Sequence, residues 1–125
     1  MSRQLPALIA AESGELRAGL QALLESIPGI GPVAQARDRQ ALRELLAHDA
    51  PLLCLADYRL ADAIYGRPRA IVVVLVERQG EQQPALAAGA ARAVMKGTPA
   101  AQLVALIDAL LTGAGAEGRA GAEEP

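Results

Sequence analysis

The chain has 125 residues, of which 52% are apolar and only 2% aromatic, and its formal net charge is -2. This length suffices for one domain with a core of its own, and the composition predicts a core of Ala, Leu, Val and Ile. The charge provides no long-range field for nucleic acid, and no cluster of Lys or Arg provides a local one. We therefore expect that this chain alone does not bind nucleic acid.

No run approaches the roughly 18 apolar residues of a membrane span. The amino terminus also lacks a basic stretch followed by an apolar signal core. We therefore expect a cytoplasmic protein that is not inserted in a membrane. Cys54, the single cysteine, lies in an apolar run, which predicts a buried and unreactive thiol. One cysteine forms neither a disulfide framework nor a cysteine metal site.

Apolar runs predict five strands, and apolar residues at helical spacing predict helices between them. The first strand is expected over residues 7–11, with Glu12 directly after it. A helix is expected from residue 15 onward, until a Pro-Gly pair ends the helical spacing. A weaker strand is expected to open at Gly31-Pro32 and to run to Ala36, and Asp38 is expected to cap the helix that follows.

The third predicted strand, residues 52–57, consists of five apolar residues followed by Asp57. Such a run is typical of a strand that is buried on both faces. In an open α/β sheet, ligands and chemistry collect in the crevice beyond the carboxyl ends of the strands. Asp57 is therefore the first candidate functional residue.

The segment at 58–68 has room for two helical turns at most before Gly66 and Pro68 end them. The next run, residues 70–76, is unbroken and rich in β-branched residues, which predicts a central parallel strand. A short helix closed by Gly89 is expected after it.

The fifth strand is expected at residues 93–95, with Lys96 directly after it. The Thr-Pro pair at 98–99 predicts the start of the last helix, with a capping hydroxyl and a proline in the first helical position. Residues 113–125 are of low complexity and are expected to be a disordered tail. The domain is therefore expected to span residues 1–112.

Strands that alternate with helices predict an α/β fold, in which a parallel sheet carries helices on both faces. The common doubly wound, flavodoxin-like order for five strands is 2-1-3-4-5. This order makes the first and third strands neighbours. It therefore places Glu12 beside Asp57, with Lys96 on the opposite wall of the crevice.

These three side chains indicate a site that binds a cation and accepts a phosphoryl group. Two neighbouring carboxylates need a shared proton or a cation, and Mg²⁺ binds one or two carboxylates while bridging to phosphate oxygens. Glu12 and Asp57 are therefore candidate metal ligands. Asp57 is also a candidate phosphoryl acceptor, with Lys96 holding the transferred group. The alternative, that all three are simply polar ends of buried strands, stays open.

The order and spacing of these segments resemble the receiver domain of bacterial response regulators, and most closely the NarL-type receivers that precede LuxR-type DNA-binding domains. The resemblance covers about residues 5–111 and is carried by residues 8–12, 16–24, 51–57, 70–74, 87–90 and 94–96. It implies a signalling domain rather than an enzyme. It also implies a histidine kinase or phosphotransfer protein as partner.

Carried over to this sequence, the resemblance makes Asp57 the phosphoacceptor and Lys96 the residue that contacts the phosphoryl group. Of the family's two acidic residues, the second is retained as Glu12, which implies a weakly bound Mg²⁺ between Glu12 and Asp57. The first falls on Ala11.

The sequence departs from the family at the residues that report phosphorylation. The hydroxyl residue at the end of the fourth strand falls on Val74, and its aromatic coupling partner falls on Ala93. The segment between Asp57 and Val74 is also shorter than in the family, which implies that the third helix is shortened or missing. We expect one sheet face beside the site to be partly uncovered, and a homodimer or a partner helix to cover it.

Two hypotheses follow. The chain is a stand-alone receiver-like domain in two-component (phosphorelay) signal transduction, with Asp57 as phosphoacceptor and impaired conventional switching. Alternatively, it is a phosphorylation-independent pseudo-receiver that acts as a dimerisation or protein-interaction module. An enzyme that binds a nucleotide or flavin on the same fold is disfavoured, because no loop carries a glycine motif that cradles phosphate.

Overall fold

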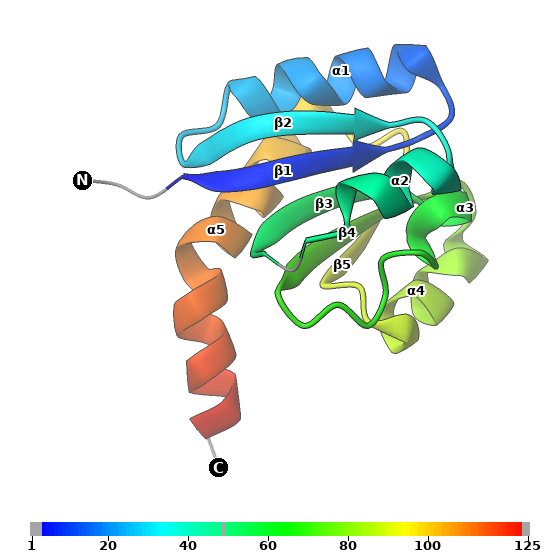
Figure 1. Cartoon of the computed structure of the whole chain (residues 1–125). Helices are drawn as coiled ribbons and strands as arrows, with labels where there is room; N and C mark the ends of the chain where they lie inside the picture. Colours follow the sequence, from blue (N-terminus) through cyan, green and yellow to red (C-terminus); the bar gives the residue numbers. More distant parts are fainter. Residues whose placement is uncertain (1–3, 49, 124–125) are drawn as a thin grey trace.

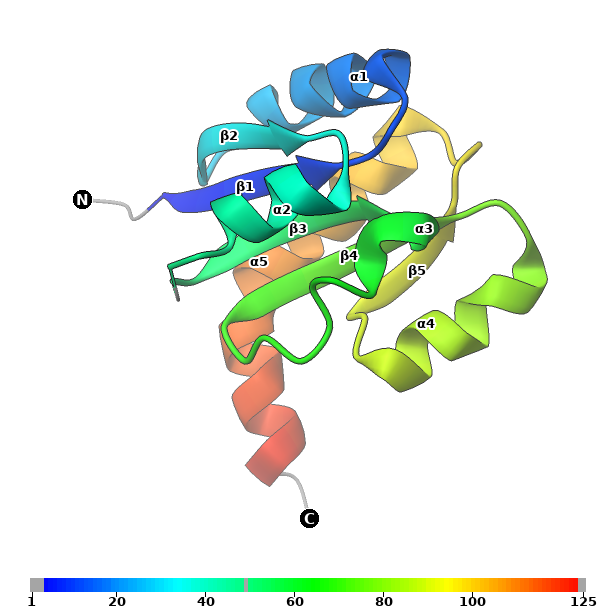
Figure 2. The same cartoon turned by 45° about the vertical axis from the view of Figure 1, so that its right-hand side comes forward.

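Five parallel strands form one sheet in the order β2-β1-β3-β4-β5, with helices on both faces (Figures 1 and 2). The computed structural model describes residues 4–48 and 50–123, with residues 113–123 described by their backbone alone. The strands are β1 (Leu5–Ala10), β2 (Ile30–Ala36), β3 (Leu52–Asp57), β4 (Ala70–Val76) and β5 (Arg92–Met95). This confirms the predicted α/β fold and strand order.

The helices are α1 (Gly14–Glu25), α2 (Arg39–Leu45), α3 (Tyr58–Ala61), α4 (Gln82–Ala88) and α5 (Ala100–Glu123), with one 3₁₀ turn at Gln79–Glu81. Two cores lie on the two faces of the sheet. Leu53 and Leu55 of β3 pack beneath α1 and α5, whereas Cys54 and Ala56 pack beneath α2, α3 and α4. In Figure 2, α2, α3 and α4 lie on the near face and α5 on the far face.

Local signals place the ends of the shorter elements. Asp38 caps α2 as predicted, because its side chain accepts a hydrogen bond of 2.8 Å from the amide of Ala41. Ser13 caps α1 in the same way. Gly89 ends α4 with a φ of 126°, a conformation that favours glycine.

Some predicted boundaries are wrong. Strand β1 ends at Ala10 rather than at residue 11, and β2 begins at Ile30. Helix α5 begins at Ala100. Pro99 therefore lies in the cap position, where its carbonyl accepts from the amides of Gln102 and Leu103 at 3.0 and 3.1 Å.

The backbone of α5 continues past Thr112 to Glu123, through most of the segment that was expected to be a tail without structure. The last two residues of that segment, 124–125, lie outside the described residues. The proposed domain boundary at residue 112 stays a prediction.

Helix α3 has only four residues, which confirms that the third helix is shortened. The expectation of a partly uncovered sheet face is wrong, because Cys54, Val72 and Val74 on that face are at most 4% exposed. Leu60 of α3 and Ile64 in the following turn fold back onto the strands and are themselves buried. The short segment thus covers the face that a longer helix would cover. Dimerisation at this face stays a prediction, but an exposed apolar surface no longer supports it.

Strands β2 and β5 are the two edges of the sheet. The register between β1 and β2 shifts by one residue between Leu5 and Ala7, opposite Gly31 and Pro32 of β2. Proline has no amide hydrogen for a strand ladder, so the pairing skips this position. Strand β5 has only four residues, and its first residue, Arg92, is exposed.

Burial raises the pKa of the Cys54 thiol to about 12, in agreement with the predicted buried and unreactive cysteine. Within residues 4–48 and 50–123, none of the helices combines the length and hydropathy needed to cross a membrane.

Candidate functional site

Asp57 lies at the carboxyl end of β3 and is the one buried charged residue among those described, with 7% of its surface exposed. Both carboxylate oxygens accept hydrogen bonds. Oδ1 accepts from the backbone amide of Arg59 at 3.2 Å, and Oδ2 accepts from Nζ of Lys96 at 3.0 Å. Asp57 thereby caps α3 and is held in one orientation.

Lys96 follows β5 and reaches across the crevice to Asp57, as the sequence predicts. Its Nζ also donates to Oε2 of Glu77 at 3.0 Å. Glu77 follows β4, and the pairing of Val76 with Met95 brings Glu77 and Lys96 to neighbouring positions. Sequence reasoning missed Glu77, although it is an acid directly after a buried strand.

The two carboxylates raise the pKa of Lys96. Burial opposes the charge and lowers the pKa, but the hydrogen bonds from Lys96 to Asp57 and Glu77, together with their negative charges, outweigh it. The side chain of Lys96 is 26% exposed. A raised pKa in the folded state means that this charge stabilises the fold at neutral pH. The contribution is lost only as the pH rises through the folded-state pKa.

Lys96 is the only lysine in the chain, so its titration can be followed alone. We expect its side chain to titrate above the ordinary lysine value of about 10.4. The measurement is an NMR pH titration of protein labelled with isotopically enriched lysine. Asp57→Asn and Glu77→Gln should each lower the pKa, and Asp108→Asn on α5 should not. An unshifted pKa in the parent protein would contradict the contacts described above.

Glu12 follows β1, the strand next to β3, so it lies near Asp57 as the strand order predicts. Arg59 contacts both acids. The guanidinium of Arg59 lies 3.2 Å from Oε1 of Glu12, while the backbone amide of Arg59 binds Asp57. The loop that carries Glu12 is held by Arg17 of α1, whose Nη1 donates to the carbonyls of Ala11 and Glu12 at 2.8 and 3.0 Å.

A second arginine holds the segment after Asp57. Nη2 of Arg39, the first residue of α2, donates to the carbonyl of Arg59 at 2.6 Å and to Oδ1 of Asp62 at 2.8 Å. The pKa of Arg39 is raised, chiefly by the hydrogen bond and charge of Asp62 and also by the charge of Glu12. The same hydrogen bond lowers the pKa of Asp62. Arg39 thus ties α2 to α3 beside the acidic site.

The switch residues implied by the resemblance are paired but carry no polar side chain. Val74 pairs with Ala93 across β4 and β5, and with Ala56 across β3 and β4. Strand β4 continues for two residues past Val74. Tyr58 and Tyr65 pack against the same core, and the hydroxyl of Tyr65 is buried without a hydrogen-bond partner.

The donor chemistry for Mg²⁺ is present, because carboxylate oxygens are the ligands that this hard cation prefers. However, Arg59 already lies beside Glu12, and Lys96 and the Arg59 amide already bind Asp57. Within the described ranges, no three His, Cys, Asp or Glu side chains are grouped to hold a metal ion. A metal ion here would therefore have few protein ligands and would compete with cations of the chain.

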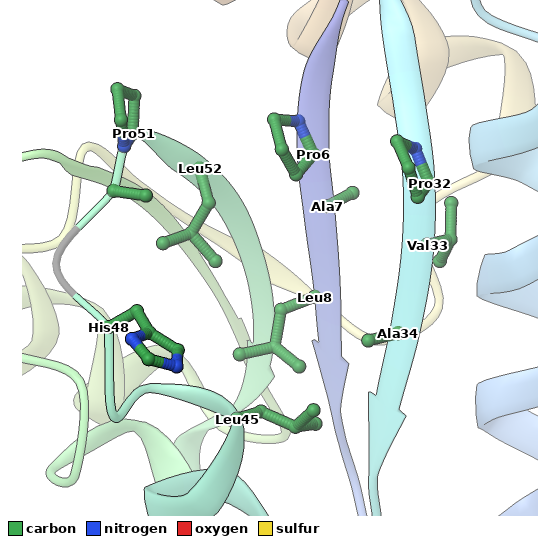
Figure 3. A pocket seen from close by; sticks show the side chains of 11 residues that line it. Pro6, Ala7, Leu8, Pro32, Val33, Ala34, Leu45, His48, Pro51 and Leu52 are labelled. Carbon is green, nitrogen blue, oxygen red and sulfur yellow. The ribbon is translucent and has the colours of Figure 1, made fainter.

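A separate apolar hollow of about 260 Å³ lies at the opposite, amino-terminal edge of β1, β2 and β3 (Figure 3). Its lining includes Pro6, Pro32, Leu45, His48 and Pro51. His48 is exposed at its rim. This hollow shares no residue with the Asp57 site.

No family model and no curated protein matches the sequence. Solved structures do match the fold. The signal receiver domain of the response regulator NarL from Mycobacterium tuberculosis has 22% sequence identity and a TM-score of 0.70, over 84% of this chain and 94% of that chain. A chain in the complex of the P1 domain of CheA3 with CheY6 from R. sphaeroides matches at 20% identity and a TM-score of 0.73. The match covers 89% of this chain and 99% of that chain.

The isolated receiver domain of RcsB from Salmonella enterica serovar Typhimurium, with the phosphomimetic BeF₃⁻, matches at 20% identity and a TM-score of 0.75. The match covers 89% of this chain and 91% of that chain. The chain spans 60% of the length of a longer RcsB chain. These likenesses establish the fold, and the chain therefore has the receiver fold of response regulators.

Proposed function

We propose that this chain is a cytoplasmic receiver-like domain of two-component (phosphorelay) signalling, and that Asp57 is its phosphoacceptor. The burial of Asp57 carries the proposal. Burying a carboxylate costs free energy, and the end of a strand does not require a buried acid. Asp57 also lies at the carboxyl end of β3, where α/β sheets bind their ligands. The ammonium of Lys96 3.0 Å from Oδ2 supports the same assignment.

The proposed reaction is a phosphoryl transfer to the carboxylate of Asp57. A carboxylate oxygen forms a bond to phosphorus while the bond between phosphorus and the leaving group of the donor breaks. The product is an acyl phosphate. Lys96 lies where it would balance the negative charge on the transferred oxygens. Mg²⁺ weakly bound by Glu12 and Asp57 would offset part of the same charge.

The proposed donor is a histidine kinase or a phosphotransfer protein. A shallow hollow of about 170 Å³ lies between α1 and α5 and includes Lys96 in its lining. Leu16 and Leu23 of α1, both partly exposed, line it as well, and they offer an apolar contact for a partner helix beside the acceptor. The likeness to the CheY6 complex with the P1 domain of CheA3 supports this class of partner.

The proposed output differs from conventional switching. Val74 has no hydroxyl to bond a phosphoryl oxygen, and its neighbour Ala93 has no aromatic ring to move. These two positions favour the second candidate function, a phosphorylation-independent pseudo-receiver that acts through dimerisation or protein binding. Under that function, Asp57→Asn would leave partner binding unchanged.

The experiment that tests the proposal is intact-protein mass spectrometry after incubation with Mg²⁺ and acetyl phosphate. We expect a gain of one phosphoryl mass in the parent chain and none in Asp57→Asn. Asp108→Asn, which changes an exposed acid of α5 outside the site, should gain the phosphoryl group. No gain in the parent under conditions that label a competent receiver would refute acceptance from small donors and favour the pseudo-receiver.

A further inference from the structure

We propose that Arg59 is the resident cation of the acidic site: its guanidinium occupies the position beside Glu12 that a divalent metal ion would need, and it thereby sets how weakly the metal binds. This inference rests on the proposed function, which assigns Glu12 and Asp57 as the metal ligands. It goes further because it assigns the control of metal affinity to a residue of the chain itself.

The contacts of Arg59 reach both acids at once. Its backbone amide donates to Oδ1 of Asp57 at 3.2 Å, and its guanidinium lies 3.2 Å from Oε1 of Glu12. A cation that bridged the same two carboxylates would have to share these oxygens with Arg59. The backbone contact holds the residue beside Asp57, so its side chain needs only to extend along the crevice to reach Glu12.

Arg39 fixes the backbone from which this side chain extends. Its guanidinium binds the carbonyl of Arg59 at 2.6 Å and the carboxylate of Asp62 at 2.8 Å. Arg59 is therefore held through its amide on one side and its carbonyl on the other. Arg39 also adds positive charge near Glu12. Arg39 thus adds a more distant positive charge to the one that Arg59 places beside Glu12.

Charge and exposure decide what this arrangement does. The side chains of Arg59 and Glu12 are 70% and 58% exposed, and an exposed pair of this kind contributes little to folding stability. A divalent ion beside the same acid, however, is repelled by each nearby positive charge. Arg59 therefore barely affects the fold but should strongly affect cation binding. Its removal should strengthen a metal site that the parent chain keeps weak.

The test measures Mn²⁺ binding, because Mn²⁺ takes the same oxygen ligands as Mg²⁺ and its free ion is observed directly by electron paramagnetic resonance. We expect Arg59→Gln to bind Mn²⁺ about tenfold more tightly than the parent chain, since one positive charge near the ion is gone. This substitution keeps the backbone amide that binds Asp57. The matched control is Arg92→Gln, which removes the same charge from the exposed start of β5 and should leave the affinity unchanged.

A second variant assigns the ligand. Adding Glu12→Gln to Arg59→Gln should abolish the gain, because the freed carboxylate is then absent. The inference is overturned if Arg59→Gln binds Mn²⁺ no more tightly than Arg92→Gln, or if the double variant keeps the gain. These outcomes can be distinguished from those of phosphoryl labelling. If the parent chain is not labelled but Arg59→Gln gains about tenfold in Mn²⁺ affinity, only the proposed function is refuted. If the parent chain is labelled but Arg59→Gln gains no affinity, only this inference is refuted.

Discussion

Replacement of Lys96 by methionine is expected to slow phosphoryl transfer to Asp57 by about a hundredfold, the scale on which one charged or hydrogen-bonding group at a reacting centre acts. Lys96 is the only lysine of the chain, and its Nζ lies 3.0 Å from Oδ2 of Asp57. Methionine keeps most of the side-chain volume and removes the ammonium. The measurement is the time course of intact-protein mass with acetyl phosphate.

The same change should lower the free energy of unfolding by about 1 to 3 kcal/mol at neutral pH, because a nearly buried carboxylate loses its charged partner. The matched control is Arg92→Met, which removes one positive charge from the exposed start of β5. Lys96→Arg keeps the charge and should retain part of the transfer rate. If Lys96→Met is labelled as fast as the parent chain, Lys96 does not act on the transferred group.

Replacement of Leu55 by alanine is expected to lower the free energy of unfolding by about 2 to 5 kcal/mol. Leu55 lies in the central strand β3, has no exposed surface, and pairs in register with Ile9 of β1 and Val73 of β4. A core with few aromatic rings offers no large neighbouring side chain to fill the cavity. The measurement is urea unfolding followed by circular dichroism.

The matched control for Leu55 is Leu86 of α4, which is 41% exposed. Leu86→Ala should cost less than about 1 kcal/mol, because much of its side chain is already in water. Equal losses in the two variants would contradict the packing of β3 beneath α1 and α5.

The strands that are buried on both faces were the most predictable part of the fold. Residues 52–57 and 70–76 form β3 and β4 with the predicted bounds, because an unbroken apolar run admits few other structures. The edge strand β2 was less predictable. Its start at Ile30 depends on pairing with Leu5 across the shift at Pro32, and sequence spacing does not specify such a contact.

The candidate site was predictable only where it depended on strand order. Asp57 and Lys96 lie at the carboxyl ends of β3 and β5, so the sheet topology predicts that they flank the same crevice. Strand β4 lies between these strands, and the long side chain of Lys96 makes the contact. The roles of Glu77 and Arg59 were missed. Their contacts depend on how long, exposed side chains extend from the strand ends, and a sequence pattern does not determine that.

The length of the segment after Asp57 did not predict correctly whether the sheet face is covered. The segment after Asp57 is too short for a normal third helix, and the sequence therefore favoured a bare face. The structure covers it with Leu60, Ala61 and Ile64, which are at most 1% exposed. A four-residue helix followed by a turn brings these three side chains onto the strands. The covering of a sheet depends on which side chains reach it as well as on helix length.

The two edges of the sheet limit how this protein can meet other chains. An open edge strand recruits strands from other molecules and so promotes aggregation and domain swapping. At one edge, Pro32 interrupts the ladder of β2, and at the other β5 is only four residues long and begins with the charged Arg92. Neither edge is a good template for a further strand. Partners should therefore attach through helices and loops, and the protein should resist sheet-to-sheet aggregation at high concentration.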